Sequence, residues 1–256
     1  MFQILKLPKG VSKIELMSDA IVIIPTYNEI ENIDSIIRAV FSQKKAFHVL
    51  IVDDNSPDGT GKAVKAIQSE FPDQLFLLER KNKSGLGAAY IAGFKWTLEK
   101  TYNYIFEMDA DFSHNPEDLI KLFNACVTDG ADVSVGSRYV KGITVVNWPM
   151  FRIILSYGAS RYVRLLTRMK VKDSTAGFVC YKRSVLEAID LSKIEFVGYA
   201  FQIEMKFKAH KKGFKIVEIP VIFKDRVKGK SKMSGSIITE AIFGVISLKL
   251  KSLFAK

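Results

Sequence analysis

The first half of the chain alternates short apolar runs with stretches of helical periodicity, and this alternation restricts the fold more than any other feature. The apolar runs with strand character cover residues 20–24, 48–52, 75–78 and 104–108. After the first of them, for example, Ile, Ile, Ile and Val recur at helical spacing over residues 33–40. A β-α-β-α series of this kind pairs its strands in parallel and places helices on both faces of the sheet. The sequence therefore predicts an α/β fold with a mostly parallel sheet.

Polar residues stand where each of these apolar runs ends. They are Pro25 to Glu29, the pair Asp53 and Asp54, the segment Arg80 to Gly87, and the pair Asp109 and Asp111. The carboxyl ends of parallel strands lie along one edge of a sheet, and ligands of such folds bind outside that edge. We therefore expect these polar groups to converge on one binding site.

The last of these strand ends carries two acidic residues close together in the sequence. An apolar strand delivers Asp109 and Asp111 within one turn, so that two carboxylates stand close together. Hard carboxylate oxygens suit Mg²⁺ or Mn²⁺ held together with substrate phosphates better than they suit zinc. Taken alone, the pair also fits a solvated acidic turn, because Asp is common in turns.

The chain is basic, with 38 Lys and Arg against 27 Asp and Glu and a net charge of +11. Such a charge indicates an anionic partner, which is nucleic acid, an anionic membrane surface or a phosphorylated substrate. No stretch approaches the ~20 apolar residues that span a bilayer. The two cysteines, Cys126 and Cys180, lack a metal-binding or redox spacing, so we expect a reducing, cytoplasmic setting.

The second half of the chain continues with less regular elements. We expect helices at residues 116–123, 148–169, 184–189, 200–210 and 236–254, and strands at 132–136, 179–181 and 215–223. In the long helical stretch, Arg161, Arg164 and Arg168 fit either a solvated face or an interfacial helix that faces lipid headgroups. Residues 224–236 are rich in Gly, Ser and Lys, which predicts a loop before the final helix.

Four motifs in order, PTYNE, VDDNSPDGT, RKNKSGLGAA and MDAD, resemble the nucleotide-sugar half of inverting glycosyltransferases of family 2 with the GT-A fold. The later motifs GSRY, DSTAGF, GYAFQIE and DRVKGKSKM resemble one branch of that family, the dolichyl-phosphate or polyprenyl-phosphate mannose synthases. The resemblance implies a Rossmann-like GT-A catalytic domain over residues 19–235, with a mixed, mostly parallel sheet. An amphipathic, membrane-associating helix over 236–256 would follow it.

The resemblance also implies a reaction and its residues. The reaction is inverting transfer of mannose from GDP-mannose to a polyprenyl phosphate. The positions implied around the guanosine are Pro25, Tyr27, Glu29, Val52, Asp54 and Lys83. Asp109 and Asp111 are implied to reach the diphosphate and a Mg²⁺ or Mn²⁺ ion, and Ser113 stands where some relatives have a Gln that helps to hold the metal. With Asp111, the residues implied for catalysis, at the acceptor phosphate and the diphosphate, are Arg138, Arg152, Arg226 and Lys232.

Two other interpretations stay open from the sequence. A family 2 enzyme that moves glucose or another sugar from a UDP donor to a lipid phosphate fits the first four motifs equally well. A noncatalytic nucleotide-binding or RNA-binding scaffold accounts for the charge but leaves the carboxylates at the strand ends unexplained. No interleaved aromatic and basic motif is present, so we expect no nucleic-acid partner.

The expected place of action is the cytoplasmic face of a membrane, because the implied acceptor is a lipid. The cationic surface and the final helix would attach the chain peripherally to that surface. Alternatively, a small membrane-protein partner would hold it there.

Overall fold

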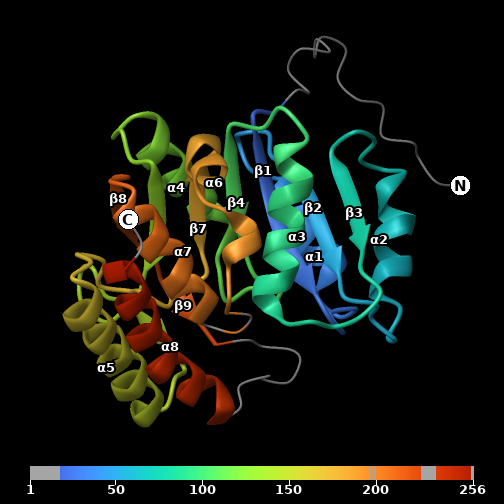
Figure 1. Cartoon of the computed structure of the whole chain (residues 1–256). Coiled ribbons are helices and arrows are strands. Elements are labelled where there is room, and N and C mark those ends of the chain that lie inside the picture. The colour runs from blue at the N-terminus through green and yellow to red at the C-terminus, as the bar shows by residue number, and fades with distance from the viewer. Residues whose placement is uncertain (1–17, 197, 199, 226–234, 255–256) are drawn as a thin grey trace, which may run out of the picture.

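A computed structural model describes residues 18–196, 198, 200–225 and 235–254. Within them, seven strands form the central sheet: β1 (Ala20–Thr26), β2 (His48–Asp53), β3 (Leu75–Glu79), β4 (Tyr104–Glu107), β5 (Val133–Ser137), β7 (Val179–Lys182) and β8 (Ile216–Pro220). Their order across the sheet is β3, β2, β1, β4, β7, β5, β8 (Figure 1). β7 runs antiparallel to β4 and β5, and the other neighbouring pairs are parallel. The predicted mixed, mostly parallel sheet is confirmed.

Helices cover both faces of the sheet (Figure 1). On one face lie α1 (Ile33–Phe41), α2 (Thr60–Gln68) and α4 (Leu119–Val127), and on the other lie α3 (Leu86–Leu98), α6 (Arg183–Ala188) and α7 (Ala200–Lys211). Successive side chains of a strand point to opposite faces. In β1, accordingly, Val22 and Ile24 pack in the core on the α1 side, whereas Ile21 and Ile23 pack in the core on the α3 side.

Two further helices, α5 (Met150–Thr167) and α8 (Gly235–Phe254), lie side by side near the carboxyl ends of the strands, at lower left in Figure 1. They pack on each other and on α7 through a third apolar cluster, which includes Val163, Ile203 and Val245. Among the described residues, no helix is long and apolar enough to cross a membrane.

The predicted strand over residues 215–223 is divided in the structure. β8 ends at Pro220, and Phe223–Lys224 forms a separate strand, β9, that pairs with β6 (Val145–Val146). Proline has no N–H to donate to a strand ladder, which explains why the main sheet stops there. The β6–β9 pair ties the segment before α5 to the end of β8. Residues 226–234, predicted as a loop, lie outside the described residues.

Short 3₁₀ turns complete the chain at Pro116–Asp118 and Leu191–Lys193. The first of them precedes α4 and begins at Asn115, whose side-chain oxygen accepts a hydrogen bond from the N–H of Glu117. Proline at the first helical position suits this start, because its missing N–H has no intrahelical partner in any case. The predicted helix at 116–123 is thus a 3₁₀ turn followed by α4.

The helix α3 approaches β1 and β2 closely at Gly93. A Cβ atom at this position would lie 2.7 Å from Cγ2 of Ile23 and 3.4 Å from Cγ2 of Val52. The shorter distance is below van der Waals contact, so only glycine lets α3 close over β1 and β2. The packing therefore fixes the two strands whose carboxyl ends carry the first predicted site residues.

Gly93→Ala is expected to lower the free energy of unfolding by about 1–3 kcal/mol, because the added methyl group forces α3 away from a close-packed core. Gly158→Ala in α5 is the matched control, since a Cβ there meets nothing within 4 Å. In a helix that substitution is expected to be neutral or to stabilise by up to ~1 kcal/mol. Urea unfolding followed by circular dichroism measures both, and equal loss of stability in the two variants would contradict the close approach.

Candidate active site

The loops after β1, β2 and β4 share an unusual backbone feature. Each contains one residue other than glycine in the left-handed conformation, namely Asn28 (φ 57°), Asn55 (φ 57°) and Phe112 (φ 59°). Asn tolerates this region, whereas a bulky residue such as Phe rarely adopts it. Backbone strain of this kind persists where the surroundings impose it and clusters at functional sites. The three loops mark the carboxyl edge of the sheet as the candidate site.

The loop after β1 carries a ring and a carboxylate. The ammonium group of Lys83, in the loop after β3, lies 4.2 Å from the centroid of the Tyr27 ring, a cation–π contact that joins the two loops. The Glu29 carboxylate accepts a hydrogen bond from Nδ2 of Asn32 at 3.0 Å, and its main-chain N–H donates to Oγ1 of Thr60 at 3.0 Å. The edge therefore presents an aromatic ring, a carboxylate and an ammonium group together.

β2 leads into two buried carboxylates with different partners. Asp53 accepts a hydrogen bond from Oγ1 of Thr26 at 2.8 Å, which fastens β1 to the end of β2. Asp54 pairs with Arg80 at 2.8 Å. Burial raises the pKa of Asp54, and the nearby Arg80 guanidinium opposes that rise. Val52 lies fully buried in the core beneath α3, so its side chain presents no surface to a ligand.

Asp109 and Asp111 follow β4 at the same edge of the sheet. The Asp111 carboxylate is buried and accepts a hydrogen bond from the N–H of Ser113 at 3.0 Å. The N–H of Asp109 donates to Nδ1 of His114 at 3.1 Å. Burial lowers the pKa of His114 to about 4, so that the ring is neutral at pH 7 and its Nδ1 accepts this hydrogen bond. His114 thereby fixes the main chain at Asp109.

The residues after β4 fit a divalent cation that is shared with a ligand. The Ser113 hydroxyl is buried and has no hydrogen-bond partner among the described residues, although it lies two positions from the Asp111 carboxylate. Among all the described residues, no group of three or more His, Cys, Asp or Glu side chains is placed to hold a metal. Two carboxylates and a hydroxyl leave about half of the six positions around Mg²⁺ or Mn²⁺ to water and to the phosphates of a bound substrate.

A cavity of about 540 Å³ adjoins these carboxylates. Its polar lining includes Asp109, Asp111 and Ser113 together with Arg138, which follows β5, and Arg152 of α5. Most of the remaining wall is apolar, and part of it comes from α5, with Ile154, Leu155, Ala159 and Val163, and from Ile203 of α7. The cavity therefore joins an ionic end, with both signs of charge, to an apolar side.

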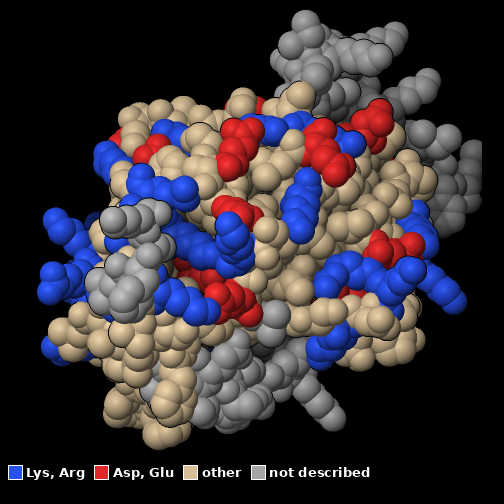
Figure 2. Space-filling view, viewed as in Figure 1, with Lys and Arg blue, Asp and Glu red and all other residues tan. Residues whose placement is uncertain are grey.

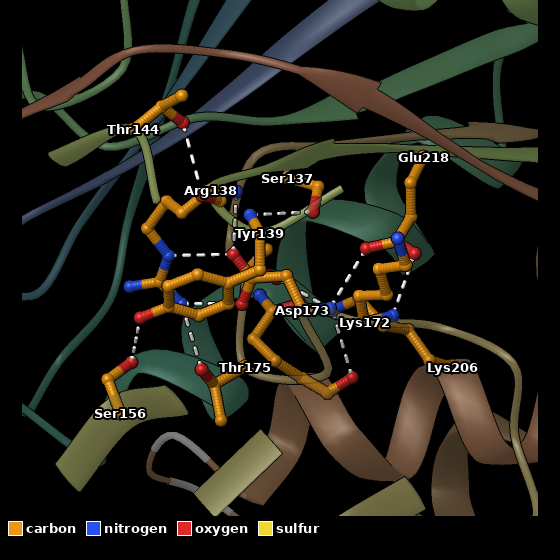
Figure 3. A network of polar contacts seen from close by, with 12 residues as sticks. Ser137, Arg138, Tyr139, Thr144, Ser156, Lys172, Asp173, Thr175, Lys206 and Glu218 are labelled. Atoms are coloured by element: carbon orange, nitrogen blue, oxygen red, sulfur yellow. Dashed lines mark hydrogen bonds and ion pairs between the residues drawn. The ribbon is translucent and has the colours of Figure 1, made fainter. Parts of the chain in front are cut away.

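The Arg138 guanidinium is held in place by a buried carboxylate (Figure 3). Nε and Nη2 donate to the two oxygens of Asp173 at 2.7 and 2.6 Å, and Nη2 also donates to Oγ1 of Thr175 at 2.9 Å. Glu218 of β8 fixes the same loop by accepting from the N–H groups of Lys172 and Asp173. Both charges of the pair are at least nine-tenths buried, so the pairing is what makes their burial tolerable.

An indole ring lies between the two arginines of the cavity. Cζ of Arg138 is 5.3 Å and Cζ of Arg152 is 3.9 Å from the centroid of the Trp148 ring. Arg152 also pairs with Asp225 at 3.0 Å. Stacking on an aromatic face orients a planar guanidinium without occupying all of its N–H donors. The two arginines are therefore pre-oriented cations on the cavity wall.

A buried polar relay runs behind the cavity from β4 to the Asp173 loop. Nε2 of Gln202 donates to Glu107 at 2.7 Å, and Nζ of Lys206 donates to Oε1 of Gln202 at 3.2 Å and to the carbonyl of Ala176 at 2.6 Å. Burial raises the pKa of Glu107 and lowers that of Lys206, while their mutual attraction opposes both shifts. Because Glu107 lies two residues before Asp109, the relay couples the carboxylate loop to the loop that holds Arg138.

The structure gathers the predicted residues in two adjoining groups. At the ends of β1, β2 and β3, outside the cavity lining, stand Pro25, Tyr27, Glu29, Val52, Asp54 and Lys83. Lining the cavity are Asp109, Asp111, Ser113, Arg138 and Arg152. Arg226 and Lys232 lie outside the described residues.

Several residues that shape the cavity are not predicted from the sequence. Asp173 and Gln202 stand inside the motifs DSTAGF and GYAFQIE, so reading those motifs residue by residue would have found them. No sequence pattern predicts that Lys206 is buried, because an isolated lysine in a helix is usually solvated. His114 has no metal-ligand spacing in the sequence, and its hydrogen bond to the Asp109 main chain is visible only in three dimensions.

Comparison with known proteins assigns the chain to a family. The model of glycosyl transferase family 2 matches residues 21–190. The polyprenol monophosphomannose synthase of Mycolicibacterium smegmatis is 49% identical over 88% of this chain and 84% of its own length. The undecaprenyl-phosphate mannosyltransferase of Micrococcus luteus is 46% identical over 87% of this chain and 90% of its own length. The chain belongs to glycosyltransferase family 2, in the branch of the polyprenyl-phosphate mannose synthases, as the motifs predicted.

Solved structures show the same fold at low sequence identity. A mannosyltransferase of Pyrobaculum calidifontis, in complex with GDP-Man and Mn²⁺, has a TM-score of 0.60 and 18% identity over 93% of this chain and 65% of that one. Glucosyl-3-phosphoglycerate synthase of Mycobacterium tuberculosis, in complex with Mn²⁺, UDP and phosphoglyceric acid, has a TM-score of 0.68 and 16% identity over 90% and 78%. The GT-A fold is thereby confirmed.

Lys206→Met is expected to destabilise the protein by about 3–5 kcal/mol, because it leaves Glu107 buried without its cation. The double variant Glu107→Gln/Lys206→Met removes both charges and is expected to recover most of that loss. Its sugar-transfer rate per folded molecule should nevertheless stay about 10- to 100-fold low, because the Ala176 carbonyl loses the donor that positions the loop.

Ser134→Ala is the control for this pair of variants, since it removes a buried hydrogen bond to the Leu122 carbonyl that lies outside the cavity lining. It is expected to cost about 1 kcal/mol of stability with an unchanged rate. Chemical unfolding and single-turnover transfer measure the two effects separately. A double variant with the wild-type rate would show that the relay only supports the fold.

Proposed function

We propose that this chain transfers mannose from GDP-mannose to the phosphate of a polyprenyl lipid, with inversion at the anomeric carbon, giving polyprenyl phosphate β-mannose and GDP. One observation carries the proposal: a single cavity holds the Asp109 and Asp111 carboxylates and the cationic pair Arg138 and Arg152, and its remaining wall is mostly apolar. A diphosphate donor, an anionic acceptor and an apolar tail each find matching chemistry there.

The donor end of the site lies along β1, β2 and β3. Tyr27 offers its ring to the guanine base, and Glu29 and Asp54 offer carboxylates to N–H and hydroxyl groups of the guanosine. Lys83, held over the Tyr27 ring, stands beside them as a cation. In this arrangement the diphosphate extends from β1 toward the carboxylates after β4, which adjoin β1 in the sheet.

A divalent cation fits this donor end. Asp109, Asp111 and the Ser113 hydroxyl, which has no hydrogen-bond partner within the described ranges, are the groups that would hold Mg²⁺ or Mn²⁺. When bound, such an ion neutralises charge on the diphosphate leaving group. His114 keeps the main chain of Asp109 in position for this role.

The acceptor end lies at Arg138 and Arg152. Guanidinium groups bind phosphate oxygens through paired N–H donors, which positions the lipid phosphate and offsets its repulsion from the donor diphosphate. The phosphate is already anionic at pH 7, so its attack on the sugar requires no strong general base. The apolar residues of α5 and α7 accommodate the first prenyl units. Arg226 and Lys232 enter this proposal from the motif DRVKGKSKM alone.

The reaction is a single displacement at the anomeric carbon. An oxygen of the acceptor phosphate forms the new bond on the face opposite to the diphosphate, while the bond to the GDP oxygen breaks and its electron pair leaves with GDP. Attack from the opposite face converts an α-linked donor into a β-linked product. Holding both anions in one cavity supplies proximity worth several kcal/mol of the barrier.

The donor preference is tested by offering labelled GDP-mannose, UDP-glucose and other sugar nucleotides to a short polyprenyl phosphate in detergent, with Mg²⁺, Mn²⁺ or EDTA. The expected result is label in the lipid from GDP-mannose alone, lost with EDTA and restored by a divalent ion. Transfer only from a UDP-sugar would keep the fold and the displacement but contradict the proposed substrate. No transfer from any donor would contradict the enzyme assignment or indicate that a membrane partner is required.

Asp111→Asn is expected to reduce transfer by about 100-fold or more, because it removes a carboxylate that orients and neutralises the donor diphosphate. The change should also weaken Mn²⁺ binding in the presence of GDP, measured by electron paramagnetic resonance. Asp129→Asn, at an exposed position outside the cavity, is the matched control and should leave both measurements unchanged. Wild-type Mn²⁺ binding in Asp111→Asn would contradict the assigned role.

A further inference from the structure

The outer side of α5 changes in character along its length. In its first half, Phe151 and Ile154 are 75% and 64% exposed, and both are apolar. In its second half, Arg161 is exposed and Arg164 is half-buried, the exposed Leu165 lies next to Arg164, and Arg168 follows the last turn. An 18-residue helix is about 27 Å long. Most of the exposed apolar residues and these basic residues therefore occupy different halves of the length of α5, and not opposite faces of the helix.

The basic half of this helix borders a groove of its own, apart from the catalytic cavity. The groove has a volume of about 480 Å³ and is lined by Tyr157, Arg161, Arg164, Leu165, Arg168, Met169 and Lys170. None of its four cations forms an ion pair with another of the described residues. The lack of ion pairs at these cations follows in part from the sequence, because residues 133–172 contain no Asp or Glu.

Basic side chains are also found on the surface near this groove. Figure 2 shows Lys and Arg side chains along the left of the view, in the region where α5 lies in Figure 1. Four cations that form no ion pair within the described part of the chain repel one another, and that cost is offset when anions occupy the space between them. Leu165 is 79% exposed beside them, so the anion that fits this groove is attached to an apolar body.

We propose that this groove binds the phosphate headgroups of anionic phospholipids and that α5 docks obliquely on a bilayer, with its apolar first half inserted and its basic second half at headgroup level. The proposal rests on the proposed function in one respect only, which is that the acceptor is a lipid. Ile154 connects the catalytic cavity to the proposed bilayer-facing surface, because it lines the cavity and is also exposed on the apolar half of α5. The cavity thus reaches the surface where the lipid tail of an acceptor would leave it.

The direct test is sedimentation of the full chain with protein-free vesicles of phosphatidylcholine alone or with added phosphatidylglycerol. The expected result is binding that requires phosphatidylglycerol and weakens as salt is raised. Arg161→Gln/Arg164→Gln/Arg168→Gln should bind the anionic vesicles about 100-fold more weakly, because each basic side chain near such a surface contributes about 1 kcal/mol.

The matched control removes three positive charges elsewhere, through Lys44→Gln/Lys62→Gln/Lys95→Gln. These lysines are exposed, have no ion pair among the described residues and lie on or next to α1, α2 and α3, away from α5. This variant should bind anionic vesicles within a few-fold of the wild type. Equal loss in both triple variants would show that net charge, and not the groove, attracts the protein, and would overturn the proposal.

Transfer to a short, water-soluble prenyl phosphate without vesicles separates this inference from the proposed function. The α5 triple variant is expected to keep the wild-type rate in that assay while it loses vesicle binding. If the wild-type chain transfers no mannose but binds vesicles only when they contain phosphatidylglycerol, the proposed function would be contradicted and the headgroup site would stand. Equal binding to both vesicle types would overturn the headgroup site, and so would displacement by inorganic phosphate at low concentration, which would indicate a site for free phosphate.

Discussion

The buried ion pair between Arg138 and Asp173 is the interaction on which the rest of the cavity depends. It fastens the carboxyl end of β5 to the loop that precedes β7, and Glu218 fixes the same loop from β8. A guanidinium buried at this depth without a carboxylate would be strongly unfavourable. Because Asp173 holds it through two hydrogen bonds, Arg138 is already oriented, and binding an anion costs it little side-chain entropy.

The same ion pair connects the two halves of the proposed reaction. The loop that holds Arg138 also contains Ala176, and Lys206 and Gln202 link Ala176 to Glu107 at the end of β4. The carboxylate loop follows directly and contains the left-handed Phe112. Donor carboxylates and acceptor cations are therefore set relative to each other by a continuous set of buried contacts, and not by two independent loops. Such pre-organisation is what transfer between two anions requires.

The sequence predicted whatever depends on local pattern. Apolar runs ending in polar turns indicate the strands and the edge where Asp109 and Asp111 lie, because a parallel strand that is buried on both faces is a continuous apolar run in the sequence. The antiparallel insertion of β7 and the division at Pro220 depend on which strands meet in space, and no local pattern carries that. Lys206 illustrates the limit most clearly, since its burial is set by a carbonyl 30 residues away in the chain. The cavity's apolar wall likewise needs α5 to pack beside α7 and α8 near the carboxyl ends of the strands.

The central claim is that an oxygen of a lipid phosphate displaces GDP from mannose in one step within this cavity. The most direct measurement uses polyprenyl phosphate with ¹⁸O in its phosphate oxygens and GDP-mannose as donor, followed by nuclear magnetic resonance and mass spectrometry of the mannosyl lipid. The account predicts a β-linked mannose whose bridging oxygen to phosphorus carries the ¹⁸O label. An α-linked product, or a bridging oxygen without label, would contradict it.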